Sequence, residues 1–536
     1  MKFDDVFVYI GEYGRYQKLL SLLMCALVVS NTFSNISTVF ISGTMDHHCK
    51  PPDEANCSEL YLGDCWNTNG SMSLPPDDKG TLLVNETKCR MYADDNKTET
   101  TTCKYGWTYD RLIFESTIVS EFDLVCEDSY KVTLSQSMYL GGFFFGSLLF
   151  GFMCDYFGRK KTTFLSFFLL LLMGVLTGLS TSYWFYAICR FIAGAADIGL
   201  AIVNFTYLNE LVAPSERAKV SAIFGCYWCF AIMILSVIAF FIRAWDTLLL
   251  VVSIILSPFL LLYLFVPESA RWLLVNGQVE EAKRVIRQIA KGNNAKDVPD
   301  EILDNLDVND SEKIKTNPLD IIRYPEMRKK TACMTYCWFA VNLGYYGLTY
   351  GVEGLNVDVY LGTFVGGVTE LLSNLCGWYF LQRFGRRNSL AGSLVSGGLA
   401  CFVNIWIPLE LIAVRTTIAM IGKFFITAAF MVVYVYTAEL FPTSIRTTGL
   451  GFCSFWSRVA AVLAPQVIFL EKVWKALPLV AFSFTAASSG VLSLLLPETL
   501  NVPLPQTIQE AELFTRKTHR QMNGVKKDTT IQQDQS

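Results

Sequence analysis

The chain alternates between long apolar runs and shorter polar connections. Twelve of these runs have about 20 or more residues, the length that crosses the hydrocarbon core of a bilayer. They cover 19–42, 132–153, 162–181, 184–209, 219–242, 245–266, 331–352, 356–381, 389–407, 410–438, 447–470 and 476–496. The pattern predicts an all-α membrane protein with 12 transmembrane helices.

Composition supports this class, because 52% hydrophobic and only 17% charged residues exclude a soluble globular protein. The first apolar run is long enough to cross a membrane and follows an acidic N-terminal segment, so we do not interpret it as a cleavable signal peptide. Basic clusters at 159–161, 328–330 and 385–387 mark the cytoplasmic side. We expect a multi-pass plasma-membrane protein with a cytoplasmic N-terminus (1–18) and a cytoplasmic tail (497–536).

A polar insert, residues 43–131, separates the first two spans and is expected to be extracellular. Six of the sixteen cysteines lie there, which predicts three disulfides of open connectivity. These cysteines are Cys49, Cys57, Cys65, Cys89, Cys103 and Cys126. Four predicted glycosylation sites accompany them, at Asn56, Asn69, Asn85 and Asn96.

A second long polar connection, residues 267–330, divides the spans into two groups of six. The first half comprises 19–42 and 132–266, and the second half comprises 331–496. The connection is expected to be cytoplasmic and carries an amphipathic helix at about 278–291.

The turn between the second and third spans has the composition expected of a gate. Asp155 is placed to accept hydrogen bonds from a facing helix N-terminus, and Arg159 to reach a carboxylate across the bundle. Gly151 and Gly158 are expected to allow close backbone approach. An ordinary basic loop would explain the cations but not the Asp and the glycines.

Related segments recur in the second half at nearly constant offsets. The turn reappears with Gln382 and Arg386, and a Glu…Arg pair seven residues apart occurs in both halves. The other gate residues predicted from these repeats are Glu210, Arg217, Glu439 and Arg446. Two parallel repeats place a substrate site at mid-membrane, between the halves.

These motifs resemble a known family. The gate turn is similar to the loop signature of the major facilitator superfamily. Segments 267–274, 438–443 and 495–500 look like the organic ion transporter family, whose members carry organic cations, organic anions or carnitine and other zwitterions. Segments 345–349 and 452–459 most resemble the carnitine/zwitterion group. The resemblance implies a major facilitator fold with a disulfide-rich insert after the first helix.

Ionisable residues inside spans are costly, so each is a functional candidate. They are Arg190, Asp197, Glu370, Lys423 and Arg458. Each is alternatively a partner in an internal salt bridge, which we favour for Arg190 because it belongs to a recurrent superfamily pattern. For Glu370 and Arg458 we favour substrate contact, and for Lys423 and Asp197 both interpretations stay open.

Arg458 is the most informative of these residues. Cation transporters of the resembled family carry Asp at this position, whereas anion and carnitine transporters carry Arg. Glu370 matches a carboxylate implicated in cation recognition in that family. The resemblance therefore implies a zwitterion, with its ammonium facing Glu370 and its carboxylate facing Arg458.

Aromatic and amide side chains in the spans complete the predicted site. A cage for a quaternary ammonium is one interpretation of the aromatic residues, and ordinary packing is the other. The aromatic residues are Trp338, Tyr345, Tyr346, Tyr434 and Tyr207. Asn31 and Asn35 share one helix face and provide either substrate contacts or interhelical hydrogen bonds.

The leading hypothesis is a carrier of small zwitterions and cations (carnitine-, ergothioneine- or amine-like) that works by alternating access. An organic anion exchanger is the nearest rival, and a non-transporting receptor or adhesion protein is the rival from another class. An enzyme is not expected, because the chain has three His and no nucleophile or phosphate-loop motif. We expect no metal, cofactor or nucleic acid; Na⁺ or H⁺ coupling and the oligomeric state stay open.

Overall fold

The computed structural model describes most of the chain. The described residues are 6–50, 89–92, 100–103, 106–295, 299, 320–351, 358–408, 410–442, 445–500, 509, 511 and 512. All structural statements below concern these residues.

The described chain is almost entirely helical. In a bilayer no water satisfies backbone N–H and C=O groups, so an apolar segment satisfies them within a helix. The first half contains α2 (Arg15–Ile41), α6 (Tyr130–Phe157), α7 (Arg159–Gly178), α8 (Tyr183–Leu211), α9 (Arg217–Phe241), α10 (Trp245–Leu256) and η3 (Ser257–Leu264). The second half contains α15 (Pro325–Tyr350), α16 (Val359–Phe384), α17 (Arg386–Ile405), α18 (Ile412–Leu440), α19 (Arg446–Phe469), η5 (Leu470–Lys472) and α20 (Leu477–Ser493).

A helix overlaps each predicted apolar run, but not all of these helices meet a membrane-span criterion. Within the described residues, nine helices are long and apolar enough to cross a membrane, and α20 is a shorter apolar helix. The number of twelve spans therefore stays a prediction.

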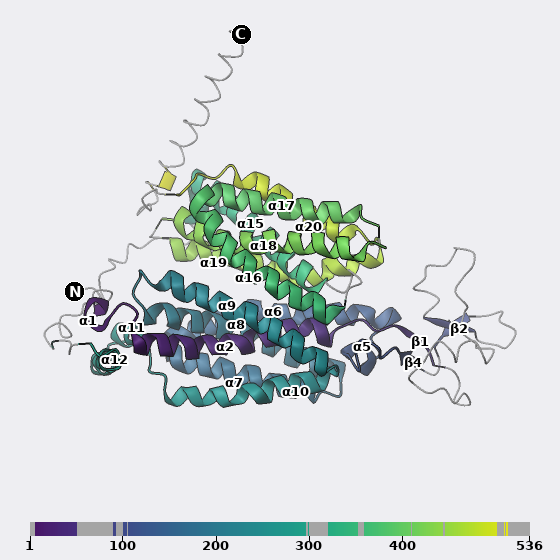
Figure 1. The fold of residues 1–536 in the computed structure, drawn as a ribbon, viewed down its shortest axis with the longest axis horizontal. Helices are drawn as coiled ribbons and strands as arrows, with labels where there is room; N and C mark the ends of the chain where they lie inside the picture. Colours follow the sequence, from purple (N-terminus) through teal and green to yellow (C-terminus); the bar gives the residue numbers. More distant parts are fainter. Residues whose placement is uncertain are drawn as a thin grey trace, which may run out of the picture.

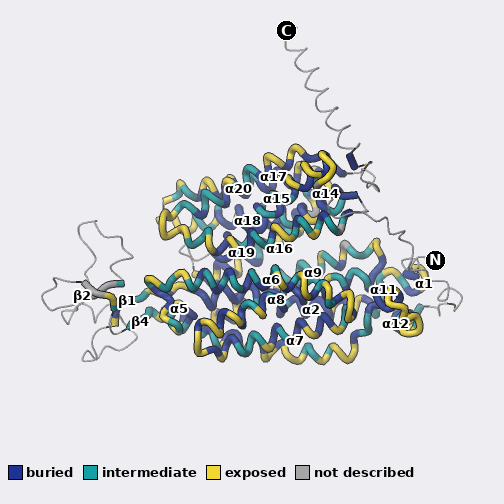
Figure 2. Tube along the Cα trace, turned by 180° about the vertical axis from the view of Figure 1, so that it is seen from behind, coloured by how far each residue is buried: buried dark blue, intermediate teal, exposed yellow. Residues whose placement is uncertain are grey.

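The helices form two bundles that lie side by side (Figure 1). The halves meet where α9 packs against α16 and where α6 packs against α19. Buried residues lie inside each bundle, and exposed apolar residues cover its outer faces (Figure 2). This distribution is typical of helices that face lipid.

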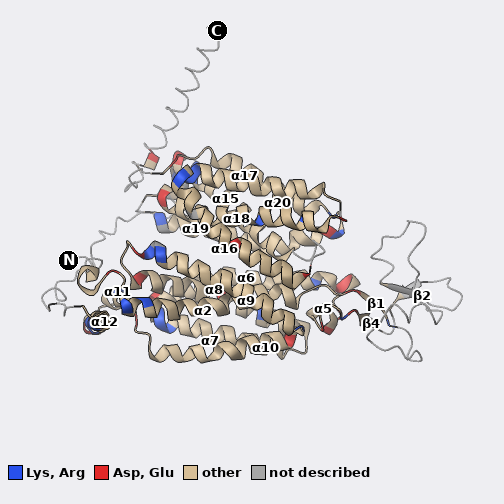
Figure 3. Ribbon diagram, viewed as in Figure 1, with Lys and Arg blue, Asp and Glu red and all other residues tan. Residues whose placement is uncertain are grey.

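Charged residues gather at the two ends of the bundles (Figure 3). We call the end that carries the β-strands the insert end, and the opposite end, with the turns at Gly158 and Gly385, the loop end. At the loop end, α1 (Phe7–Ile10), α11 (Ala270–Val275) and α12 (Val279–Gly292) cover the first half, and α14 (Asp320–Arg323) precedes α15. Helix α12 coincides with the predicted amphipathic helix.

Polar side chains from distant segments cap the first helix of each half. Asn293, which follows α12, accepts from the Tyr16 N–H at the start of α2 (2.9 Å). Glu512 accepts from the N–H groups of Glu326 and Met327 at the start of α15 (2.9 and 3.0 Å). These contacts fasten the segment after each half to that half's first helix.

The insert folds around short antiparallel strand pairs. β1 (His47–Cys49) pairs with β4 (Trp107–Tyr109), and β2 (Arg90–Tyr92) pairs with β3 (Thr100–Thr102). Helix α5 (Ile118–Glu121) and turn η2 (Cys126–Ser129) lead into α6.

Four of the six insert cysteines form disulfides, Cys49 with Cys103 and Cys89 with Cys126. Residues 57 and 65 and all four predicted glycosylation sites lie outside the described residues. The third disulfide and the glycans therefore stay predictions.

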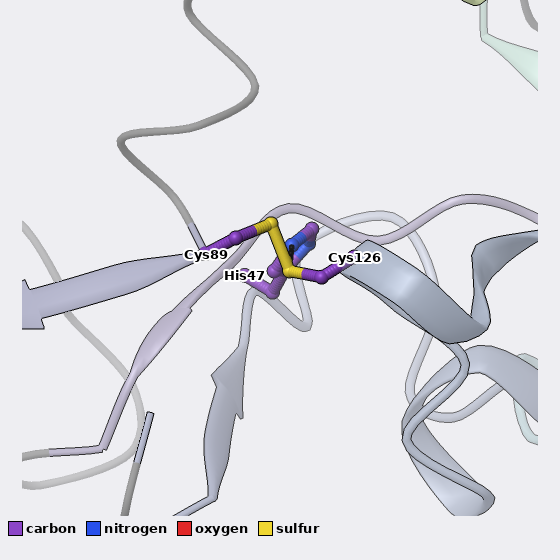
Figure 4. A group of neighbouring side chains, drawn as sticks. All are labelled: His47, Cys89 and Cys126. Atoms are coloured by element: carbon purple, nitrogen blue, oxygen red, sulfur yellow. Dashed lines mark hydrogen bonds between the residues drawn. A yellow bond between two sulfur atoms is a disulfide. The ribbon is translucent and has the colours of Figure 1, made fainter. Parts of the chain in front are cut away.

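The His47 imidazole lies beside one of these disulfides, with Nε2 3.9 Å from Cys126 Sγ (Figure 4). His47, Cys89 and Cys126 are near enough to one another to hold a metal ion. Because the two sulfurs are bonded to each other, they are not thiolates, the form that ligates metal.

Replacing Cys89 and Cys126 by Ser is expected to reduce surface abundance more than solute affinity. A cross-link over this separation stabilises a fold by about 3–4 kcal/mol, and the insert lies outside the bundles. Surface biotinylation with uptake kinetics measures both quantities, and Cys376→Ser, a free cysteine, is the control. Normal surface abundance with a strongly raised KM would contradict this expectation.

Candidate functional site

An ion pair lies buried in the middle of the second half. Lys423 Nζ on α18 lies 3.0 Å from Glu370 Oε1 on α16, and the two side chains are only 4% and 2% exposed. The Tyr345 hydroxyl donates to Glu370 Oε2 (3.2 Å). The observed geometry is thus the internal salt bridge, and a substrate role for Glu370 stays a prediction.

The pair is connected to the first half through Tyr345. Trp228 on α9 donates from Nε1 to the Tyr345 hydroxyl (3.3 Å). A line of polar contacts therefore runs from α9 through α15 and α16 to α18. Nearby, Asn374 Nδ2 on α16 donates to Cys229 Sγ on α9 (3.5 Å), which is a second polar contact between the halves.

Asp197 is fully buried and satisfied within the first half. Asn31 on α2 donates to Oδ1 (2.5 Å), and the Tyr139 hydroxyl on α6 donates to Oδ2 (2.7 Å). The Arg190 guanidinium carbon lies 4.0 Å from the Tyr139 ring centroid, and Arg190 also donates to Thr38 Oγ1 (2.5 Å). Tyr139 therefore connects the two charges through a cation–π contact and a charge-assisted hydrogen bond.

Asn31 and Asn35 differ in their surroundings although they share a helix face. Asn31 makes the interhelical hydrogen bonds that one interpretation of the sequence proposed. Asn35 is buried beside the Tyr346 hydroxyl, and neither of its amide atoms has a hydrogen-bond partner among the described residues.

Arg458 differs from the other four ionisable residues. It lies roughly 18 Å from the start of α19, near mid-membrane. Tyr346 on α15 and Tyr434 on α18 are near enough to interact with it electrostatically. Within the described residues it makes no hydrogen bond or ion pair, so this charge has no compensating carboxylate.

Four of the five predicted aromatic residues form two ring pairs, each with one member, Tyr346 or Tyr434, near Arg458. Ring centroids lie 5.3 Å apart for Tyr345 and Tyr346, and 4.3 Å apart for Trp338 and Tyr434. Trp338 is fully buried, donates from Nε1 to Thr437 Oγ1 (2.9 Å) and packs edge-on against the Tyr434 ring. The Tyr434 side chain is 46% exposed.

The assignment of Tyr207 to this cage is wrong. Its hydroxyl donates to the Pro267 carbonyl (3.0 Å) at the loop end. Tyr436 makes the same contact with the Pro497 carbonyl (2.6 Å) in the second half. A contact that recurs in both repeats is structural, and spacing along one helix did not reveal the depth at which Tyr207 lies.

The gate residues of the first half form a network at the loop end. Arg159 donates to both carboxylate oxygens of Glu210 (2.9 and 3.1 Å), which is a bidentate contact. Glu268 Oε1 accepts from the backbone N–H groups of Arg159 and Lys160 (2.9 and 3.0 Å), at the N-terminus of α7. Ser269 donates to Glu210 Oε2 (2.5 Å) and closes the network.

The second half repeats this network. Arg386 Nη2 donates to Glu439 Oε1 (2.9 Å), and Glu498 accepts from the backbone N–H groups of Arg386 and Arg387 (2.8 and 3.1 Å). Thr499 donates to Glu439 Oε2 (2.6 Å), as Ser269 does to Glu210. The repeat predicted from sequence is therefore present at the level of individual hydrogen bonds.

Two gate predictions are corrected. The acceptor at the helix N-terminus is Glu268 rather than Asp155, whose side chain is 80% exposed and contacts Arg159 (3.2 Å). A Cβ on Gly151 would meet no atom within 4 Å, so Gly151 does not serve close approach.

The remaining gate candidates are Arg217, Gln382 and Arg446. Arg217 donates from Nε to the Asn209 carbonyl (3.1 Å). Gln382, the counterpart of Asp155, is exposed, and Arg446 lies half-buried at the start of α19.

Sequence reasoning missed several residues that the geometry brings into the site. Glu268 and Glu498 were visible only as members of a repeated Pro-Glu pair. Tyr139 and Trp228 carried no signal, because an aromatic residue in an apolar span is usually packing. The similar offsets of Glu268 and Glu498 from Gly158 and Gly385, 110 and 113 residues, were the one usable hint.

Two repeated helical halves, buried charges at mid-membrane and paired networks at one end define a membrane transporter of the major facilitator superfamily. The family model of sugar (and other) transporters matches residues 80–510. The chain belongs to this family, and its relatives include organic cation and carnitine transporters.

Among these relatives is the organic cation transporter protein of Drosophila melanogaster, 33% identical over 530 residues and matched over 96% of both chains. Human organic cation/carnitine transporter 2 is 32% identical over 546 residues (97% of this chain, 95% of that protein). Human solute carrier family 22 member 13 is 35% identical over 527 residues (96% and 93%).

A solved structure with the same fold is the partially occluded inward open form of the xylose transporter XylE from E. coli. It has a TM-score of 0.58 and 16% identity, and the match covers 90% of this chain and 98% of that one. At this identity the likeness supports the fold and says nothing about the solute.

The two glycines of the gate turn are expected to respond differently to alanine. Gly158 has φ +105°, and a Cβ there would lie 2.4 Å from Glu268 Oε2, so Gly158→Ala displaces the carboxylate from the α7 N-terminus. We expect maximal uptake to fall several-fold with KM nearly unchanged, because the network lies far from Arg458. Gly151→Ala is the matched control and is expected to behave as wild type; equal behaviour of the two variants would contradict the network's role.

Proposed function

We propose that this protein moves small organic ions bearing a carboxylate, zwitterions foremost, across the plasma membrane by alternating access. The observation that carries the proposal is Arg458, a mid-membrane cation without a counter-charge among the described residues. The names of its relatives, which include organic cation/carnitine transporters, support the same substrate class.

Charge balance supports a carboxylate in the solute. Asp197 and Arg190 are compensated within one cluster, and Glu370 and Lys423 within another. Arg458 is the remaining cation, and an isolated charge in a low-dielectric interior is strongly disfavoured. A solute carboxylate supplies the missing anion, and one charge-assisted hydrogen bond contributes about 1.5–3 kcal/mol.

The cationic end of a zwitterion has aromatic neighbours. Tyr346 and Tyr434 lie close to Arg458, and Tyr345 packs against Tyr346; rings around a quaternary ammonium contribute about 0.5–2 kcal/mol each. Because Lys423 already neutralises Glu370, we assign the ammonium mainly to these rings. Glu370 then adds only a weaker attraction for the ammonium, because Lys423 offsets most of its charge.

An organic anion exchanger is the second candidate, and the same Lys423–Glu370 ion pair favours it. With Glu370 neutralised, the cavity carries the uncompensated positive charge of Arg458, which attracts a simple carboxylate as well. A receptor or adhesion protein agrees less well with two intact gate networks, which a simple anchor would not need.

Membrane orientation and energy source belong to the same proposal. Lys and Arg at 159–161 and 385–387 lie at the loop end, which supports a cytoplasmic location of that end and of both termini. An ion gradient, of Na⁺ or H⁺, or exchange against a second solute would drive uphill transport.

Substituting Arg458 tests the carboxylate contact directly. Arg458→Gln is expected to weaken carnitine-like zwitterions and aryl carboxylates by roughly ten- to a hundredfold. Arg458→Asp is expected to abolish their uptake while sparing or improving tetraethylammonium. Competition uptake normalised to surface abundance provides the measurement. Equal loss for all three solute classes would mean that Arg458 is structural.

A double-mutant cycle at the ion pair separates the two candidate functions. Glu370→Gln alone leaves a buried Lys423 unpaired, which destabilises a protein by about 3–5 kcal/mol, and the double variant with Lys423→Met should recover much of this stability. If zwitterions are the substrates, the recovered double variant loses only the minor contribution of Glu370, seen as a modest loss of affinity for zwitterions, and keeps its affinity for aryl carboxylates unchanged. Thermal unfolding in detergent and uptake of both solutes decide the question; additive destabilisation would contradict the pairing.

A further inference from the structure

Tyr360 lies between the two halves at the insert end. It belongs to the first turn of α16, in the second half, and is only 5% exposed. Its ring stacks on Phe40 of α2, with centroids 5.5 Å apart and planes 8° apart. Phe240 of α9 lies edge-on at 5.8 Å, and Phe114 of the insert lies at 6.0 Å. A second-half side chain is thus buried among first-half residues.

The insert also holds the Tyr360 hydroxyl. This hydroxyl donates to the Ile113 carbonyl (3.1 Å), in the segment 110–116 that follows β4. We call this segment the base of the insert. Phe114 in the same segment is buried against the ring, so both the ring and the hydroxyl of Tyr360 contact the base.

The base is itself fastened to the first half. Arg243, which follows α9, donates from Nη1 to the Leu112 carbonyl (3.2 Å), and its own carbonyl accepts from the Glu115 N–H (3.2 Å). The Trp245 N–H donates to the Ser116 carbonyl (3.3 Å). Because of these bonds, the base moves with α9 and α10, whereas Tyr360 moves with α16.

The contact therefore lies where two rigid bodies must separate. In alternating access, the halves rock around a central site, and contacts at the closed end break before that end opens. Other contacts at this end join α6 and α19, where Ser137 donates to the Val462 carbonyl (3.0 Å) and accepts from Gln466 Nε2 (3.1 Å).

We propose that Tyr360, docked on the base of the insert, is one of the contacts that hold the two halves together at the insert end. The insert thereby acts as part of the gate and not only as an appendage. This inference rests on the proposed alternating access, and it adds a gating role for the insert and for a residue that binds no solute.

A cysteine reporter tests the proposal without any substrate. Tyr434→Cys places a thiol at an exposed position near Arg458, and a membrane-impermeant maleimide added from the insert side reports how often that end opens. The same protein without the reporter gives the background from the native free cysteines.

Two substitutions at Tyr360 are then compared in the reporter background. Tyr360→Phe keeps the ring and removes one hydrogen bond, so labelling is expected to become about two- to tenfold faster. Tyr360→Ala removes the ring as well and is expected to have the larger effect. Arg243→Gln, which releases the Leu112 carbonyl, is expected to act in the same direction as Tyr360→Phe.

Tyr379→Ala is the matched control, because Tyr379 lies on the same helix, is exposed, and has its ring contact among the described residues with Phe380 of that helix. Labelling rates are normalised to surface abundance, and Tyr360→Phe keeps the test decisive if Tyr360→Ala does not fold. Unchanged labelling in Tyr360→Phe and Arg243→Gln, or an equal increase in Tyr379→Ala, would overturn the proposal.

Uptake of the solute panel by the unmodified protein separates this inference from the proposed function. If carnitine-like zwitterions are taken up and labelling does not respond to Tyr360, the gating role fails and the function stands. If labelling responds as expected and no panel solute is taken up, the gating contact stands and the substrate assignment fails.

Discussion

A charge that leaves water for the middle of a bilayer needs a counter-charge or a set of hydrogen bonds, and this constraint organises the centre of the molecule. Asp197 meets it with Asn31 and Tyr139, and Arg190 meets it with the Tyr139 ring and Thr38. Glu370 and Lys423 meet it through each other. Each solution lies within one half, so rocking of the halves need not expose a broken ion pair.

The same principle applies at the loop end, where the charges belong to backbone as well as side chains. The N-termini of α7 and α17 carry unsatisfied N–H groups with partial positive charge. Glu268 and Glu498, each contributed by the segment after the half's last helix, accept from these groups. Each half is consequently closed on itself, which makes it a rigid body with few bonds to break when it moves.

Sequence patterns predicted the helices, the repeat and the identity of the ionisable residues, because each depends on residues near one another in the chain. They did not predict partners across helices. Lys423 and Glu370 lie on different helices, and only the rotation of α16 against α18 decides that they meet. The error at Tyr207 has the same origin: its depth in the bundle depends on where α8 sits relative to Pro267.

The glycines illustrate a related limit. Gly151 and Gly158 look equivalent in the sequence, but only Gly158 has a positive φ and a carboxylate against its α-carbon. A glycine signals that space or an unusual conformation is possible, whereas the neighbour that uses the space comes from a distant segment.

Under the proposed function, Arg458 also explains why the carrier closes more readily with solute bound than without it. Closing the cavity over a bare guanidinium removes its hydration without replacement, which is strongly unfavourable. A bound carboxylate replaces that hydration with a charge-assisted contact, so the closed state becomes accessible when the solute is present. A ligand shifts a conformational equilibrium only through its different affinity for the two states, and here the difference arises from a single desolvated charge. Binding and closure are then coupled without any contact between Arg458 and the gate networks.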